Sequence, residues 1–187
     1  MLDLETMGNG PTAAIVAIGA CEFDPHGADP GMGFPDVPVT STFYQRVDLE
    51  SSVQAGLTMD VSTVLWWMQQ SDDARQQTFQ RGGAGLYDAI NQFAGFVNNV
   101  SGCNREGVAV WGNGATFDNV IIRSAFKACD TEAPWSFRND RCYRTVVNLL
   151  PEDRRPAFER SGTSHNALDD AVTQARHLQK VYWALGL

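Results

Sequence analysis

The chain has 187 residues, of which 43% are hydrophobic and 10% aromatic, so it can form one domain with an ordinary buried core. It has no run of about 18 or more apolar residues and its start is not typical of a secretory signal, so we expect a cytoplasmic protein without a membrane span. The formal net charge of −8 argues against a protein that coats duplex nucleic acid, although carboxylates that hold divalent cations can still meet phosphate through the metals.

The first part of the chain predicts an antiparallel meander. Residues 1–6 are expected to form a short strand that leads into a glycine-rich turn over residues 7–12. Only two residues precede Asp3, so either the natural N-terminus is longer or the first strand is unusually short. The apolar stretch 13–23 and the alternating stretch 42–48 are expected to be neighbouring strands. Residues 24–40, rich in proline and glycine, are typical of an exposed irregular loop.

The rest of the chain predicts helices and one further strand. The strand, over residues 107–111, leads directly into the turn Gly112-Asn113-Gly114. Helices are expected over residues 60–70, 72–80, 86–100, 116–129, 140–150 and 164–183. Strands first, followed by a strand among helices, indicate an α/β domain in which helices flank a mixed β-sheet.

The helix over residues 60–70 raises a question about Trp66. Its apolar positions follow helical spacing and predict a stripe that faces the core, with Asp60 as the N-cap. The stripe consists of Val61, Val64, Leu65 and Met68. Trp66 lies about 150° from the centre of this stripe, so it needs another partner. Packing against a neighbouring element and stacking on a nucleic-acid base both remain open.

Asp3 and Glu5 form the first candidate site. They alternate with Leu2 and Leu4, so a strand would project both carboxylates from one face and bury the leucines on the other. Taken alone, this pattern more often marks a solvated strand face than a pair of metal ligands.

Asp118 forms the second candidate site, in the first turn of a helix just beyond the strand 107–111. Taken alone, a carboxylate there is better explained as a charge that offsets the helix dipole. The third site, at the start of the last helix, contains His165, Asp169 and Asp170. A histidine at this place is commonly a cap, and the helical angles put the two aspartates on opposite flanks of the apolar stripe, so periodicity cannot choose between them.

The chain carries three motifs in order: D-x-E on the first strand, F-D after a later strand and H-x4-D at the last helix. This ordered set resembles the DEDDh (DnaQ-like) family of 3′-to-5′ exonucleases. The resemblance covers essentially the whole chain and implies one exonuclease domain over residues 1–187 with a ribonuclease-H-like fold. It assigns the metal ligands to Asp3, Glu5, Asp118 and Asp170, leaving Asp169 outside the site. The segments 65–70, 111–119 and 139–145 look most like a phage and bacterial exoribonuclease-like branch.

This resemblance implies two divalent cations in each active site, with Asp3 between them. Ligands that are all carboxylates favour Mg²⁺ or Mn²⁺ over Zn²⁺, and the four scattered cysteines contain no CxxC pair that would indicate a zinc ribbon. His165 is better explained as a general base than as a ligand, because its unperturbed pKa of about 6.5 lets neutral imidazole accept a proton from water.

The remaining expectations concern partners and substrate contacts. The resemblance implies hydrolysis at the 3′ ends of single-stranded nucleic acid, RNA or DNA, and the release of nucleoside monophosphates. The candidate substrate contacts are Thr6, Met7, Trp66, Asn113 and Asn119. Many family members carry asparagine where this chain has Gly114, which leaves the role of Asn113 open. A homodimer is possible by resemblance, and the rival hypothesis is a catalytically silent domain that binds nucleic acid or acts as a scaffold.

Overall fold

The computed structural model describes residues 1–27, 39–80, 82–114 and 116–187. The greater part of the predicted loop 24–40 therefore lies outside the described residues. Within the described ranges, no helix is both long enough and apolar enough to cross a membrane.

The predicted meander is confirmed as a three-stranded antiparallel sheet in the order β1-β2-β3. It consists of β1 (Leu2–Thr6), β2 (Ile15–Cys21) and β3 (Thr42–Arg46). The central strand β2 is buried along its whole length, because α7 (Ala167–Leu185) packs on it and neighbouring helices cover the rest. The β1–β2 register shifts between Glu5 and Thr6, directly after the pair of carboxylates.

A second, parallel sheet pairs β4 (Val110–Gly112) with β5 (Asp140–Cys142). The fold is thus mixed α/β, as predicted, but the described strands form two small sheets and not one. The expected helix over residues 140–150 is wrong at its start, where the chain forms β5 before α6 (Tyr143–Val147) begins. Asp140 is held there by a two-bond contact from Arg123, with oxygen–nitrogen distances of 2.9 and 3.0 Å.

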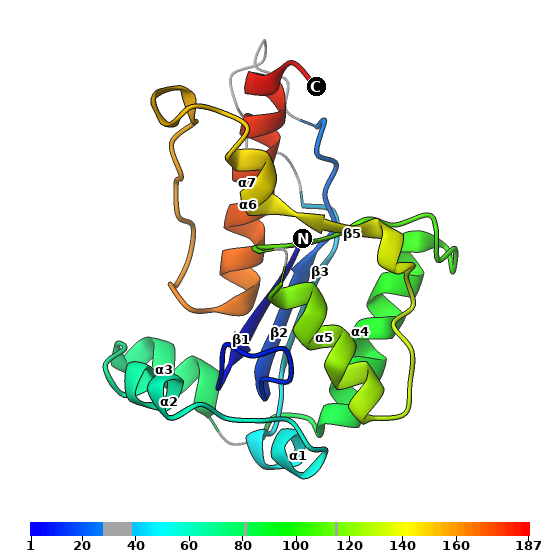
Figure 1. Ribbon diagram of the computed structural model, residues 1–187, viewed down its shortest axis with the longest axis vertical. Coiled ribbons are helices and arrows are strands. Elements are labelled where there is room, and N and C mark those ends of the chain that lie inside the picture. Colours follow the sequence, from blue (N-terminus) through cyan, green and yellow to red (C-terminus); the bar gives the residue numbers. More distant parts are fainter. Residues whose placement is uncertain (28–38, 81, 115) are drawn as a thin grey trace.

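Helices cover both sides of the first sheet (Figure 1). In that view α7 runs along one side of the strands, α4 and α5 lie on the other, and α2 and α3 lie beyond the end of β1. The remaining helices are α1 (Leu49–Gln54), α2 (Val61–Met68), α3 (Asp72–Phe79), α4 (Leu86–Ser101) and α5 (Asp118–Ala128), with 3-10 turns at Phe137–Asn139 and Glu152–Arg154. The short helix α1 was not predicted, because its sequence carries no apolar stripe.

Helix α2 corrects the prediction about its buried face. Three members of the expected stripe are exposed, Val61 at 76%, Leu65 at 54% and Met68 at 65%. The buried residues are instead Thr63 and Trp67, and the indole N–H of Trp67 donates to the Thr6 carbonyl oxygen at 2.9 Å. Burial of one large indole, which also gives the carbonyl at the end of β1 a hydrogen bond, stabilises this two-turn helix more than burial of the three aliphatic side chains would.

The N-terminus of α7 lies unusually close to β2. A Cβ atom at Gly19 would overlap the backbone of Ala167 and Leu168, so only glycine permits this approach. The side chain of Asn166 caps the helix by accepting the N–H groups of Leu168 and Asp169. This contact fixes the start of α7 against the first sheet.

Candidate active site

The first strand presents its carboxylates as predicted. Leu2 and Leu4 are buried in the core, while Asp3 and Glu5 project from the other face of β1. Glu5 is itself only 7% exposed. Two acidic groups on a mostly buried strand face require compensating partners, which a solvated strand face would not need.

Asp118 opens α5 and joins three elements. Its side chain is buried, and one oxygen accepts the Leu4 N–H at 3.2 Å while the other accepts the Asn113 N–H at 2.7 Å. These bonds tie the start of α5 to β1 and to the residue after β4. Asp118 therefore does more than offset a helix dipole, since its orientation is fixed from both strands.

The structure separates the two neighbouring aspartates of α7. Asp170 lies beside Glu5, accepts the His165 N–H at 3.2 Å and forms an ion pair with Arg160. Asp169 turns toward the preceding loop and accepts the Thr163 N–H at 2.7 Å. Asp170 thus belongs to the carboxylate cluster, whereas Asp169 anchors the loop.

His165 completes the cluster from the residue before the N-cap of α7. A ring nitrogen of His165 and one carboxylate oxygen each of Glu5 and Asp170 all lie within 4.8 Å of one another. The backbone of His165 has φ of 63°, a left-handed conformation that is uncommon for histidine. The bond from its N–H to Asp170 and a 3.4 Å contact from the Thr78 hydroxyl to its carbonyl hold this conformation.

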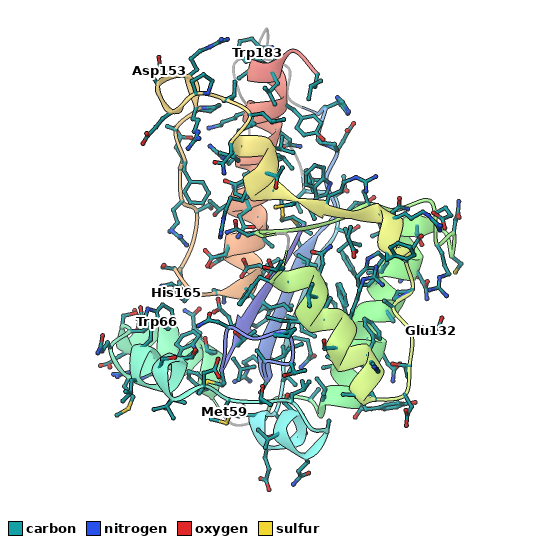
Figure 2. The ribbon with its side chains drawn as sticks, in the orientation of Figure 1. Met59, Trp66, Glu132, Asp153, His165 and Trp183 are labelled. Carbon is teal, nitrogen blue, oxygen red and sulfur yellow. The ribbon has the colours of Figure 1, made fainter. Side chains whose placement is uncertain are left out.

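Two tryptophans surround the imidazole. The ring of Trp66 meets His165 edge-on with centroids 4.9 Å apart, and Trp67 lies 6.1 Å away. Figure 2 shows His165 at the start of α7 next to Trp66 on α2. The aromatic walls limit the positions of the imidazole, yet Trp66 keeps 41% of its surface exposed.

Burial raises the pKa values of the site carboxyls, with a further contribution from neighbouring charges at Asp3 and Glu5. Burial, followed by the charges of Asp118, Glu5 and Asp170, raises the pKa of Asp3 well above its usual range. Burial and the charges of Asp170 and Asp118 raise the pKa of Glu5 to about 8. Burial also raises the pKa of Asp118 to about 6, although backbone N–H groups oppose this shift. Several carboxyls that resist ionisation together form a set that divalent cations would neutralise.

Two cavities flank this cluster. The first, about 460 Å³, is called here the aromatic cavity, and its lining includes Glu5, Trp66, Trp67, His165 and Asp170. The second, about 600 Å³, is called the polar cavity, and its lining includes Asn113, Asp118, Arg144, Thr145 and Asn148. Asp3, Asn9 and Phe117 line both cavities. Asp3 therefore lies between them.

The sequence profile of one known family, described as the 3′-5′ exoribonuclease Rv2179c-like domain, matches residues 1–182. The chain belongs to this family. A search of curated proteins gave no match. Membership makes the protein a hydrolase of the 3′-to-5′ exoribonuclease class and confirms the predicted DEDDh (DnaQ-like) relationship.

Two of the expected substrate contacts in this exoribonuclease domain line the aromatic cavity. They are Trp66 and Thr6, although the Thr6 hydroxyl donates to the Gly8 carbonyl at 2.7 Å. Asn113 lines the polar cavity, where its N–H holds Asp118 and its carbonyl accepts from Arg144.

The structure does not bring the other two expected contacts to either cavity. The side chain of Met7 is buried in the hydrophobic core. Asn119 is also buried, and its amide donates to the Val110 carbonyl at 2.9 Å. Both residues support the elements that carry the carboxylates, Met7 after β1 and Asn119 between α5 and β4.

Gln174 and Arg160 are site residues that the sequence analysis missed. Gln174 lies on α7, is buried, and donates to the Asp3 carboxylate at 2.7 Å, while its own carbonyl oxygen has no hydrogen-bond partner among the described residues. Arg160 reaches Asp170 from the loop before α7. Gln174 follows Asp170 by one helical turn, so helical spacing could have placed it on the same face.

Proposed function

We propose that this exoribonuclease domain removes nucleoside monophosphates one at a time from the 3′ end of single-stranded RNA, with two bound divalent cations and His165 as the general base. The main support is that Glu5, His165 and Asp170 lie within 4.8 Å of one another in the aromatic cavity, and that Asp3 lines both this cavity and the polar cavity that contains Asp118. Family membership also supports a ribonuclease-H-like arrangement of the mixed α/β fold.

The donor set fits two hard cations. Asp3, Glu5, Asp118 and Asp170, which line the two adjoining cavities, are the residues that would hold the cations. Oxygen ligands favour Mg²⁺ or Mn²⁺, and four carboxylates carry enough negative charge to balance two divalent ions. When bound, such a pair neutralises the phosphate and lowers the pKa of an attacking water.

His165 supplies the proton acceptor in this scheme. Its position beside Glu5 and Asp170 places the imidazole on the side of the aromatic cavity, where a water would approach the phosphorus. The oxygen of water forms the new bond to phosphorus, its proton passes to His165, and the bond to the 3′ oxygen of the preceding nucleotide breaks. That departing oxygen takes a proton from solvent.

The aromatic cavity suits the terminal nucleoside. Trp66 offers an exposed ring at its rim, and bases stack on such rings with little dependence on sequence. Because the ring also contacts His165, Trp66 combines the two roles that the sequence left open. The turn at Thr6 closes the other side of this cavity.

The decisive experiment follows labelled oligomers through degradation. Single-stranded RNA and DNA of matched sequence, labelled at either end, are incubated with Mg²⁺, Mn²⁺ or EDTA. We expect metal-dependent release of mononucleotides from the 3′ end of RNA, with Asp3→Asn inactive and still folded. Cleavage of DNA that is faster than cleavage of RNA would make single-stranded DNA the substrate and would leave the proposed mechanism unchanged.

A silent binding domain is the alternative that this experiment also tests. With both proteins folded, no cleavage of any oligomer, together with RNA binding that does not depend on metal, would overturn the proposed function. The intact set of five cluster residues favours the enzyme. The possible homodimer stays a prediction, which sedimentation of the purified protein would check.

A further inference from the structure

The two cavities that flank the carboxylates differ in chemistry. The aromatic cavity is bounded by the rings of Trp66 and Trp67, which suit a base. Asn9 and Phe117 line both cavities, but only the polar cavity also contains Asn113, Thr116, Arg144, Thr145 and Asn148. A ribose and a phosphate match the second lining better than the first.

Arg144 is the cation of the polar cavity. It lies on α6 with an exposed side chain, and its guanidinium donates to the Asn113 carbonyl at 3.1 Å. Within the part of the chain that the structure describes, it forms no salt bridge with a carboxylate. Four further N–H donors of a guanidinium remain after this one bond, enough for a bidentate contact with phosphate.

The position of His165 sets the direction of the RNA strand. A water activated beside Glu5 and Asp170 attacks from the side of the aromatic cavity. In an in-line displacement the leaving 3′ oxygen departs on the opposite side. Asp118 and the polar cavity lie on that side of Asp3, so the nucleotide that keeps this oxygen must extend there.

We propose that the polar cavity is a subsite for the penultimate ribonucleotide and that Arg144 binds the phosphate on its 5′ side. The inference rests on the proposed function and assigns the substrate on the far side of the broken bond. Asn113 is part of this subsite through its backbone, since its N–H orients Asp118 and its carbonyl orients Arg144. The open question about Asn113 is thereby answered with a positioning role.

The test compares substrates that do or do not reach the polar cavity. The p-nitrophenyl ester of uridine 5′-monophosphate carries the terminal nucleoside and a nitrophenyl leaving group but neither a second ribose nor a second phosphate, whereas a short RNA oligomer fills both cavities. We expect Arg144→Gln to raise KM for the oligomer by about 10-fold or more, the usual effect of a lost bond to a charged group, and to change KM for the ester far less, because the ester lacks the phosphate that Arg144 would bind. A 5′-phosphorylated dinucleotide should show the effect, and its unphosphorylated form should not.

Arg141 provides the matched control. It lies three residues earlier on β5, is exposed, and donates to the Arg138 carbonyl at 2.8 Å away from both cavities. Arg141→Gln removes the same charge and should change KM for either substrate by less than about twofold. Arg144→Gln should also reduce the slope of log KM against log salt by about 0.7, the value for one contact with a single strand, and Arg141→Gln should not.

The outcomes separate the inference from the proposed function. If Arg144→Gln raises KM equally for the ester and the oligomer, or for neither, the proposed subsite is overturned. The proposed nuclease function is not affected by that outcome. If the unmodified protein cleaves neither substrate with Mg²⁺ or Mn²⁺, the proposed function itself fails.

Discussion

At the scale of single residues, Asp3 depends on a neighbour that is far away in the chain. Gln174 donates to its carboxylate at 2.7 Å, and this bond opposes the rise in the pKa of Asp3. A carboxylate that holds a cation must keep one orientation, and hydrogen bonds from outside the ligand set commonly provide it. Under the proposed function, Gln174 would therefore be a positioning residue for metal binding by Asp3.

Gln174→Leu tests this role. We expect the affinity for Mn²⁺, measured by electron paramagnetic resonance, to fall by about 10- to 100-fold, as for other residues that orient metal ligands. Gln179→Leu is the control, because Gln179 is equally buried on α7 but donates to the Asp24 carbonyl, outside the cluster. Equal losses in both variants would indicate a general packing defect.

His165→Asn tests the general base. Asparagine tolerates the left-handed backbone of His165 but cannot act as a base near neutral pH. We expect kcat to fall by about 10²- to 10⁴-fold while the affinity for Mn²⁺ stays unchanged, which would separate a base from a metal ligand. An unchanged kcat would exclude histidine from the role of general base.

At the scale of elements, the contact between β2 and α7 controls the geometry of the site. Gly19→Ala would push against the backbone of Ala167 and Leu168, at the start of the helix that carries Asp170. We expect a loss of about 1–3 kcal/mol in the free energy of unfolding, measured with urea, and a larger loss of activity than unfolding explains. Gly95→Ala, at an open and exposed position on α4, should instead stabilise by up to about 1 kcal/mol.

The elements also show what the sequence could predict. The strands of the first sheet and α5 were predictable because apolar patterning and helical spacing coincide with burial there, and the order of the motifs suggested the site. Strand β5 was not predicted, since its residues were expected to be helical. The exposed stripe of α2 was not, since Trp67 found its partner in the distant Thr6 carbonyl. Asp169 and Asp170 were likewise separable only once the loop at Thr163 was placed beside the helix.

At the scale of the whole molecule, the buried carboxyls couple stability to pH. Glu5 changes from an ordinary pKa of 4.5 to about 8 in the folded protein, and the pKa values of Asp3 and Asp118 also rise. At pH values between the ordinary pKa and the raised pKa, the folded state binds more protons than the unfolded state. The free energy of unfolding contributed by this cluster therefore falls as the pH rises through that window.

A thermal melt in EDTA checks this sign. We expect the melting temperature to fall between about pH 5 and about pH 8, and Asp3→Asn to flatten the dependence. Divalent cations bind the ionised carboxyls of the folded chain, so Mn²⁺ should raise the melting temperature more at the higher pH. A melting temperature in EDTA that rises over this range would contradict the prediction.

The bond between Gln174 and Asp3 spans 171 positions of the chain. Bringing such distant residues together carries an entropic cost, which the packing of α7 on β2 offsets. Cations held by carboxylates from both β1 and α7 would further stabilise the contact between these two ends of the chain. A partly synthesised or unfolded chain would keep those carboxylates apart, so under the proposed function we expect cleavage activity only after the chain has folded.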